Sequence, residues 1–158
     1  MNSCKLISLD ASTSSTGFGV FLGGNFSRCG LIKPYNNNAS DRFKNMLNEI
    51  LDVLNKEKPD IVVIERMHQT RNVDGFRKLC KLSGVVEYWC IKNGREYIEL
   101  SPAQWRASAK EENSKLPRKR EELKQWAVDR VKEIYNLDVT EDCAEGILIG
   151  YGYINSFI

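Results

Sequence analysis

The chain has 158 residues, of which 42% are hydrophobic and 28% are charged, and its formal net charge at pH 7 is +2. This length and composition are typical of a soluble globular protein, and we expect residues 1–158 to form a single domain with a substantial core. Five cysteines without a C-x-x-C pair indicate reduced, mostly buried thiols, and the lack of a signal segment or membrane-length apolar run indicates a cytoplasmic protein.

The first half of the chain is expected to contribute most of a sheet. Three short strands come first, with a tight Gly-Gly-Asn turn between the last two, at residues 5–10, 17–22 and 26–33. Ser40 is the expected N-cap of an amphipathic helix that runs to Leu54, because apolar residues recur there at helical spacing. Residues 60–65 then form a strand that is apolar on both faces, as in a sheet covered by helices on two sides.

The second half is predicted to be mainly helical. A helix from Val73 to Ile91 is apolar around more than half its circumference, so we expect it to be buried on two sides. Residues 109–117 are polar, charged and expected to be mobile. The remaining elements are a strand, a short helix, a long amphipathic helix and a last helix capped by Thr140, at residues 96–100, 101–105, 123–135 and 140–151. This order predicts one mixed α/β layer structure.

Four acidic residues stand at positions that favour a shared site. Asp10 and Glu65 each end a predicted apolar strand, and parallel neighbouring strands would bring both carboxylates to one edge of the sheet, where open α/β sheets bind ligands. Asp142 and Glu145 are three residues apart at the start of the last predicted helix, so they project from one face. Such a set suits a pair of hard divalent cations, which can activate a water and stabilise the leaving oxygen of a phosphodiester.

Each acid also has a simpler explanation. Taken alone, Asp10 or Glu65 fits a turn cap or an ion pair with Arg66 better than a metal ligand. The two acids of the last helix are favoured in its first turn by the helix dipole. Only the set of four favours a metal site.

Two basic segments interrupt an otherwise acidic chain. The stretch at residues 66–81 carries a net charge of +4, because five basic residues oppose the single acid Asp74. The KLPRKR stretch at residues 115–120 carries another +4. Positive segments of this kind indicate a contact with a polyanion, although a charged run is more often a solvated face.

Four motifs in order carry a resemblance to a known family. LDASTSSTG with a following hairpin, then VVIERM, SPAQW and EDCAEGILIG, resembles the RuvC-type Holliday junction resolvases of the ribonuclease H-like superfamily, in particular their short phage versions. The resemblance implies an α/β fold with a mixed five-stranded sheet, its first three strands antiparallel, flanked by helices on both faces. It also implies a homodimeric endonuclease that nicks two opposed strands of a four-way DNA junction, with two Mg²⁺ ions per active site, for which Mn²⁺ substitutes.

The resemblance assigns roles to particular residues. It makes Asp10, Glu65, Asp142 and Glu145 the metal ligands and catalytic residues; Glu145 departs from the aspartate that the family commonly has. Met67 and His68 fall on the loop that enters the junction. The helix from Val73 to Ile91 corresponds to the dimerisation element, although simple core burial explains its apolar surface equally well.

The remaining expected DNA contacts are hydroxyl and basic side chains. The hydroxyl run after Asp10 either closes its own turn or contacts a phosphate. The basic residues flank the expected site or precede the penultimate helix, where they would bind the DNA backbone in a salt-dependent way. The full set is Ser12, Thr13, Ser14, Arg66, Arg71, Arg77, Lys78, Lys115, Arg118, Lys119 and Arg120.

Three alternatives stay open. An aspartate before a hydroxyl- and glycine-rich turn also resembles the first phosphate loop of actin- and hexokinase-like ATPases, although this chain has no second phosphate loop. A non-catalytic DNA-binding module of the same fold would keep the basic segments but would not need the four acids. Another ribonuclease H-like nuclease, acting on RNA–DNA hybrids or other branched DNA, shares both features.

Overall fold

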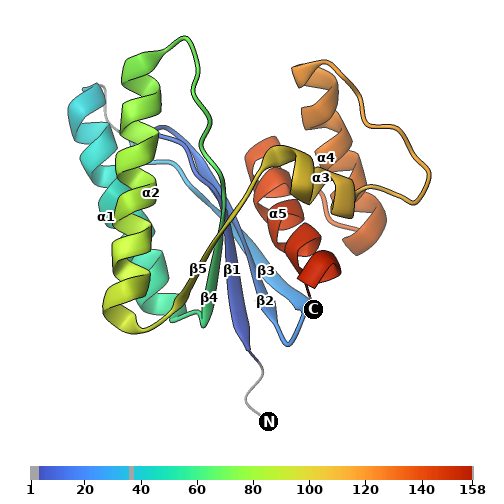
Figure 1. Cartoon of the computed structure of the whole chain (residues 1–158), viewed down its shortest axis with the longest axis horizontal. Helices are drawn as coiled ribbons and strands as arrows, with labels where there is room; N and C mark the ends of the chain where they lie inside the picture. The colour runs from blue at the N-terminus through green and yellow to red at the C-terminus, as the bar shows by residue number, and fades with distance from the viewer. Residues whose placement is uncertain (1–3, 36–37, 158) are drawn as a thin grey trace.

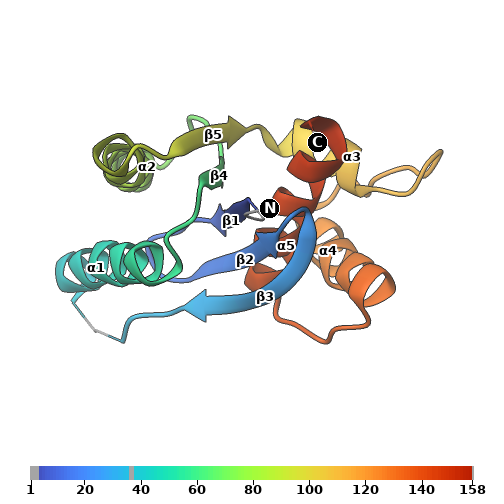
Figure 2. The ribbon, with the colours of Figure 1, turned by 90° about the horizontal axis from the view of Figure 1, so that it is seen from below.

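The centre of the molecule is a five-stranded sheet in the order β3-β2-β1-β4-β5 (Figures 1 and 2). The computed structural model describes residues 4–35 and 38–157. Strand β1 pairs antiparallel with β2 and parallel with β4; β2 pairs antiparallel with β3, and β4 pairs parallel with β5. The strands are β1 (Lys5–Asp10), β2 (Thr16–Leu22), β3 (Asn25–Ile32), β4 (Ile61–Glu65) and β5 (Glu96–Leu100).

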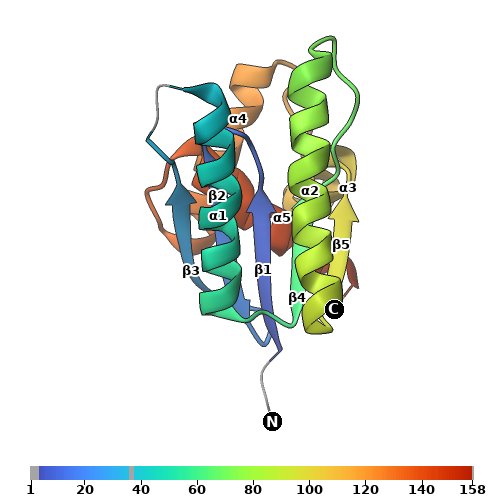
Figure 3. The same ribbon diagram turned by 90° about the vertical axis from the view of Figure 1, so that its left-hand side faces the viewer.

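Helices cover both faces of this sheet, which confirms the predicted fold class. One layer consists of α1 (Ala39–Glu57) and α2 (Val73–Asn93), which lie side by side in front of the sheet in Figure 3. The other layer consists of α3 (Pro102–Ala109), α4 (Arg120–Tyr135) and α5 (Glu141–Phe157), on the opposite side in Figure 1. In the described part of the chain, none of the helices is both long and apolar enough to cross a membrane.

Two apolar clusters, one on each face of the sheet, form the core. Successive side chains of a strand point to opposite faces of the sheet and so belong to different clusters. Ile7 and Ile64 point to the α1–α2 side, whereas Leu6 and Val63 point to the α3–α5 side. All four side chains are at most 3% exposed. The central strands are thus buried on both faces, as their apolar sequences predict.

Helix α5 lies close to the sheet because glycines meet at the crossing. A Cβ on Gly146 would lie 2.6 Å from the carbonyl carbon of Gly17, so any larger residue would collide with the β2 backbone. The buried Ser8 hydroxyl donates to the Gly146 carbonyl at 2.6 Å and ties α5 to β1. This close crossing brings the first turns of α5 to the end of β1.

Some local predictions were wrong. The N-cap of α1 is Asn38, whose side chain accepts from the backbone N–H groups of Ser40 and Asp41, so Ser40 lies inside the helix. Helix α3 continues past the predicted end to Ala109. The five cysteines are free, but Cys4 and Cys80 are exposed rather than buried.

Helix α2 is buried on one side within this chain, not on two. Leu82, Val86 and Cys90 face the core, while Tyr88 and Ile91 on the outer face are 64% and 70% exposed. Gly84 lies on the same outer face, and a Cβ there would meet nothing within 4 Å. The second covering layer expected from the sequence is therefore not supplied by the described part of the chain.

Candidate active site

Three carboxylates converge where β1 ends and α5 begins. Asp10 is the last residue of β1, and Asp142 and Glu145 lie in the first turns of α5. One oxygen from each of the three carboxylates lies within 4.8 Å of the others. Thr140 fixes the start of α5, since its hydroxyl accepts from the backbone N–H of Cys143 at 3.4 Å. The predicted cap at Thr140 is therefore confirmed.

The fourth acid, Glu65, stands beside this cluster. Parallel pairing of Leu9 with Ile64 places Asp10 and Glu65 at the same edge of the sheet. Glu65 is outside the three-carboxylate group, and its Oε2 accepts a hydrogen bond from the indole Nε1 of Trp105 at 2.6 Å. The structure therefore brings all four acids to one place but holds Glu65 by a separate contact.

Among these acids, Asp10 has the most strongly raised pKa. Burial raises the pKa of Asp10 well above its ordinary value, and the negative charges of Glu145 and Glu65 raise it further. Burial also raises the pKa of Glu145, against the opposing effects of a hydrogen bond with Asp10 and the positive charge of Arg106. A cation placed among these oxygens would remove the repulsion.

Three side chains outside the predicted site contact its acids or a neighbouring acid. The Ser15 hydroxyl donates to Asp142 Oδ2 at 2.6 Å. The Arg106 guanidinium lies 3.8 Å from Glu145 Oε1, and Lys124 donates to the neighbouring Glu141 at 3.1 Å. Nothing in the sequence distinguished Ser15 from the other hydroxyls of its run.

The four acids line a cleft of about 770 Å³, which we call the acidic cleft. Its rim is basic, because Arg106, Arg118, Arg120 and Lys124 line it as well. Carboxylate oxygens gathered at this spacing are the ligands preferred by hard divalent cations such as Mg²⁺. The residues present therefore fit a metal-dependent site that faces a polyanion.

The hydroxyl run after Asp10 mostly closes its own turn. The Ser12 hydroxyl donates to the Ser15 carbonyl at 2.6 Å and accepts from the Ser15 backbone N–H at 2.9 Å. Ser12 and the exposed Ser14 line the acidic cleft, whereas Thr13 does not. A phosphate contact from Ser12, Thr13 or Ser14 stays a prediction.

The basic residues predicted to bind DNA fall into three groups. Arg118 and Arg120 line the acidic cleft. Arg66 lines a neighbouring pocket of about 540 Å³, with its Nε 3.6 Å from a Glu99 carboxylate oxygen. The other predicted contacts do not line the acidic cleft: Arg71, Arg77, Lys78, Lys115 and Lys119.

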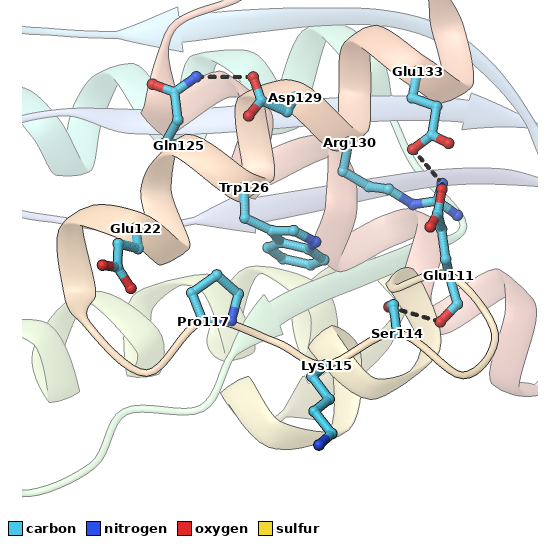
Figure 4. Close-up of a pocket in the computed structure, with 10 residues that line it drawn as sticks. All are labelled: Glu111, Ser114, Lys115, Pro117, Glu122, Gln125, Trp126, Asp129, Arg130 and Glu133. Carbon is cyan, nitrogen blue, oxygen red and sulfur yellow. Dashed lines mark hydrogen bonds and ion pairs between the residues drawn. The ribbon is translucent and has the colours of Figure 1, made fainter.

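Lys115 and Lys119 illustrate why this placement was hard to predict. Lys115 lies by a separate pocket around Trp126, and in Figure 4 its side chain points away from that indole ring. Lys119 precedes α4 and lies 3.8 Å from Glu122. The turn between residues 115 and 120 thus directs neighbouring basic residues to different places.

The loop after β4 separates the two residues expected to enter the junction. Met67 packs against the core cluster on the α1–α2 side, which leaves it less available to stack on a base. His68 is exposed and lines both the acidic cleft and the neighbouring pocket. Of the two, only His68 lines the acidic cleft, and its contact with DNA stays a prediction.

The sheet order, the acids at the ends of β1 and β4, and the acids on the crossing helix α5 define a ribonuclease H-like fold. The family model described as crossover junction endodeoxyribonuclease RuvC matches residues 6–115, and the chain belongs to the RuvC family. RuvC from Prosthecochloris aestuarii is 28% identical over 104 residues, which are 63% of this chain and 56% of that protein. The chain thus spans little more than half the length of this relative.

Solved structures support the same fold. Thermus thermophilus RuvC in complex with a Holliday junction substrate has a TM-score of 0.72 at 16% identity, covering 96% of this chain and 93% of that one. The Fowlpox virus resolvase, in complex with Holliday junction DNA, has a TM-score of 0.66 at 15% identity, covering 98% and 99%. The yeast mitochondrial Holliday junction resolvase has a TM-score of 0.66 at 12% identity, covering 97% and 78%.

Proposed function

We propose that this protein is a divalent-metal-dependent endonuclease that hydrolyses phosphodiester bonds in four-way (Holliday) and related branched DNA junctions. The observation that carries the proposal is the convergence of four carboxylates in a cleft with a basic rim. Membership of the RuvC family supports it, because that family is described by its crossover junction endonuclease activity.

Asp10, Asp142 and Glu145 are the residues that would hold a metal ion together, with Glu65 as the fourth ligand. The oxygens of Asp10, Asp142 and Glu145 are close enough to share a cation. Burial is the largest cause of the raised pKa of Asp10, and the charges of Glu145 and Glu65 add a repulsion that a cation would relieve. Mg²⁺ is the proposed ion, with two per site and Mn²⁺ as a substitute; when bound, such a pair activates a water and stabilises the leaving oxygen. Glu145, with its longer side chain, reaches the cluster and is included among the ligands.

The chain's own contribution is to bind and orient DNA phosphates. Arg106, Arg118 and Arg120 border the acids, so a phosphate at the cleft would be paired with guanidinium groups. The Ser15 hydroxyl holds Asp142 in a fixed orientation.

A homodimer formed through α2 is part of the proposal. The outer face of α2 presents Tyr88, Ile91 and the open position at Gly84. Tyr88 and Ile91 are about one helical turn apart on this face, so they form an apolar patch that a second copy could cover. A two-fold dimer carries two identical sites, and this arrangement suits paired nicks in opposed strands of a four-way junction.

The ATPase alternative has little support. The Ser12 hydroxyl donates to the Ser15 carbonyl within the turn, and the Ser15 hydroxyl donates to Asp142. The hydroxyl run is therefore not an open phosphate-binding loop. Family membership also favours the nuclease.

The test is a panel of four-way junction, fork, flap, linear duplex and RNA–DNA hybrid substrates, each with Mg²⁺, Mn²⁺ or EDTA. We expect metal-dependent nicking of the four-way junction and poor cutting of linear duplex. Asp10→Asn and Glu65→Gln should lower the rate by more than about 100-fold, the upper range for losing even an outer partner of a metal site. Junction binding should persist or tighten, because repulsion of phosphate by carboxylate is relieved.

Asp138→Asn is the matched control, since Asp138 is 87% exposed and paired with Lys132. It should cut like the wild type. Wild-type cleavage rates for Asp10→Asn would disprove the site. Equal cutting of linear duplex would disprove junction selectivity. Preferred cutting of the RNA–DNA hybrid would favour a different nuclease of this fold. Tight ATP binding without any cleavage would favour the ATPase.

A further inference from the structure

Trp105 connects helix α3 to Glu65 by a short hydrogen bond. Its indole Nε1 donates to Glu65 Oε2 at 2.6 Å, and the side chain is only 1% exposed. A hydrogen bond to a charged acceptor in a poorly hydrated place is stronger than one between neutral groups. The contact therefore restricts Glu65 more than an ordinary surface hydrogen bond would.

The local sequence holds Trp105 in place. Ser101 caps α3 by accepting from the Gln104 backbone, and the Gln104 side chain accepts from the Ser101 N–H. Pro102 fixes the first turn between them. At Gly152 of α5, a Cβ would lie 2.6 Å from the Trp105 carbonyl oxygen, so the two helices touch through backbone. Trp105 is thus fixed relative to α5, which carries Asp142 and Glu145.

The indole ring of Trp105 also stacks on a second indole, that of Trp126. Its centroid lies 6.3 Å from that of Trp126, with the rings inclined by 28°. Trp126 in turn lines a surface pocket of about 400 Å³ between α4 and the preceding loop (Figure 4). Stacked aromatic packing leaves the Trp105 ring little freedom to turn its N–H away from Glu65.

We infer that Trp105 is a positioning residue that fixes Glu65 for metal binding. The indole N–H engages Oε2 and leaves Oε1 as the carboxylate oxygen that Trp105 does not engage. Trp105 touches neither substrate nor metal in this role and acts only through Glu65. The inference rests on the proposed function, because it takes Glu65 as a ligand. Loss of such an outer partner typically weakens metal binding 10–100-fold.

The test measures Mn²⁺ affinity directly, by electron paramagnetic resonance of free Mn²⁺ during a titration without DNA. Trp105→Phe keeps an aromatic ring and removes the N–H donor, so we expect Mn²⁺ to bind about 10-fold more weakly. Trp89→Phe is the matched control: Trp89 is 8% exposed and donates its Nε1 to Asn55 at 2.8 Å, away from the acids. It should leave Mn²⁺ affinity unchanged.

A double-mutant cycle separates positioning from general loosening of the fold. If Trp105 acts through Glu65, the Trp105→Phe/Glu65→Gln protein should bind Mn²⁺ as Glu65→Gln alone does. Additive losses would show that Trp105 acts by another route. Circular dichroism checks folding, and if Trp105→Phe does not fold, 3-benzothienylalanine at this position keeps the shape of tryptophan and removes the N–H.

The outcomes also separate this inference from the proposed function. If Glu65→Gln leaves Mn²⁺ affinity unchanged, Glu65 is not a ligand and the proposed metal site is wrong. If Glu65→Gln weakens Mn²⁺ binding while the variant without the indole N–H binds like the wild type, the metal site stands and the positioning role of Trp105 is wrong.

Discussion

Asp10 is the residue at which stability and the proposed activity conflict most directly. It ends a buried strand, and burial together with the charges of Glu145 and Glu65 raises its pKa. A raised pKa in the folded state means that the ionised carboxylate destabilises the folded chain. In the absence of metal, therefore, the folded protein carries a free-energy cost at neutral pH that a neutral isostere would remove.

We expect Asp10→Asn to raise the stability of the metal-free protein at pH 8 by about 1 kcal/mol, or roughly 2–4 °C in Tm. The sign follows from linkage. The folded-state pKa of Asp10 lies above its unfolded value of about 4, so its favourable contribution is complete below about pH 4 and is lost as pH rises through the folded-state pKa. The gain from the substitution should therefore shrink as pH falls towards 4.

Thermal unfolding in EDTA between pH 4 and pH 8 measures this difference. Asp138→Asn serves again as the exposed control and should change stability by less than about 0.5 kcal/mol at every pH. A stability gain for Asp10→Asn that is independent of pH would show that the raised pKa is not its cause.

At the scale of single residues, the acids of the site could be predicted from the sequence, whereas their hydrogen-bond partners could not. The four acids were predicted because each ends a strand or begins a helix, positions that a pattern of apolar residues reveals. Ser15 and Trp105 were not predicted as partners of the acids. Their contacts join residues 127 and 40 positions apart, and no local pattern encodes such a pairing.

At the scale of elements, the position of α5 on the sheet determines the site. Gly17 and Gly146 let the backbones of β2 and α5 approach, and this approach carries Asp142 and Glu145 towards Asp10. The glycines thus serve the site through packing rather than through backbone freedom. A side chain at the crossing would lift the helix away from the strand.

Gly146→Ala should destabilise the fold by about 1–3 kcal/mol, since the added methyl group would meet the Gly17 carbonyl carbon at 2.6 Å. Gly84→Ala is the matched control, also a glycine inside a helix, where a Cβ meets nothing within 4 Å. In the Tyr88→Glu background, where α2 is expected to have no partner, it should stabilise by about 0.5–1 kcal/mol through helix propensity alone. Urea unfolding gives both values, and equal shifts in the midpoint would contradict the close crossing.

Two of the short strands were predicted with their correct bounds. The strands at residues 5–10 and 96–100 have the predicted bounds, because short apolar runs with clear ends leave little choice. Helix α3 was predicted too short, since its last turn, residues 106–109, carries no apolar stripe. The N-cap of α1 was misplaced because asparagine and serine are similarly favoured at N-cap positions, and Asn38 and Ser40 are only two residues apart.

For the whole molecule, the largest difference between prediction and structure is the burial of α2, whose outer face is exposed in the described chain. Its sequence predicted burial on two sides, and the described chain covers one. A sequence alone cannot distinguish a helix buried by its own chain from one buried by a second copy, because both need the same apolar residues. The proposed dimer accounts for the uncovered side.

We expect the wild-type protein to be a dimer at micromolar concentration and Tyr88→Glu to be a monomer with the same helical content. The introduced charges would face each other across a symmetric interface and resist burial. Light scattering and sedimentation measure the mass, and junction assays should show loss of paired nicks.

Tyr35→Glu is the control, because Tyr35 is 91% exposed and lies after β3, on another part of the molecule. It should remain a dimer. A monomeric wild-type protein would remove the dimer from the proposal, and a dimeric Tyr88→Glu protein would place the interface elsewhere.

The close crossing of α5 over the sheet has a consequence for the protein's synthesis. All five strands precede α5 in the chain, whereas two of the three clustered carboxylates, Asp142 and Glu145, lie on that helix. A nascent chain that has emerged only as far as residue 140 contains every strand of the sheet but lacks both carboxylates of α5. If the site acts as proposed, cutting of DNA becomes possible only after the last helix has folded onto the completed sheet.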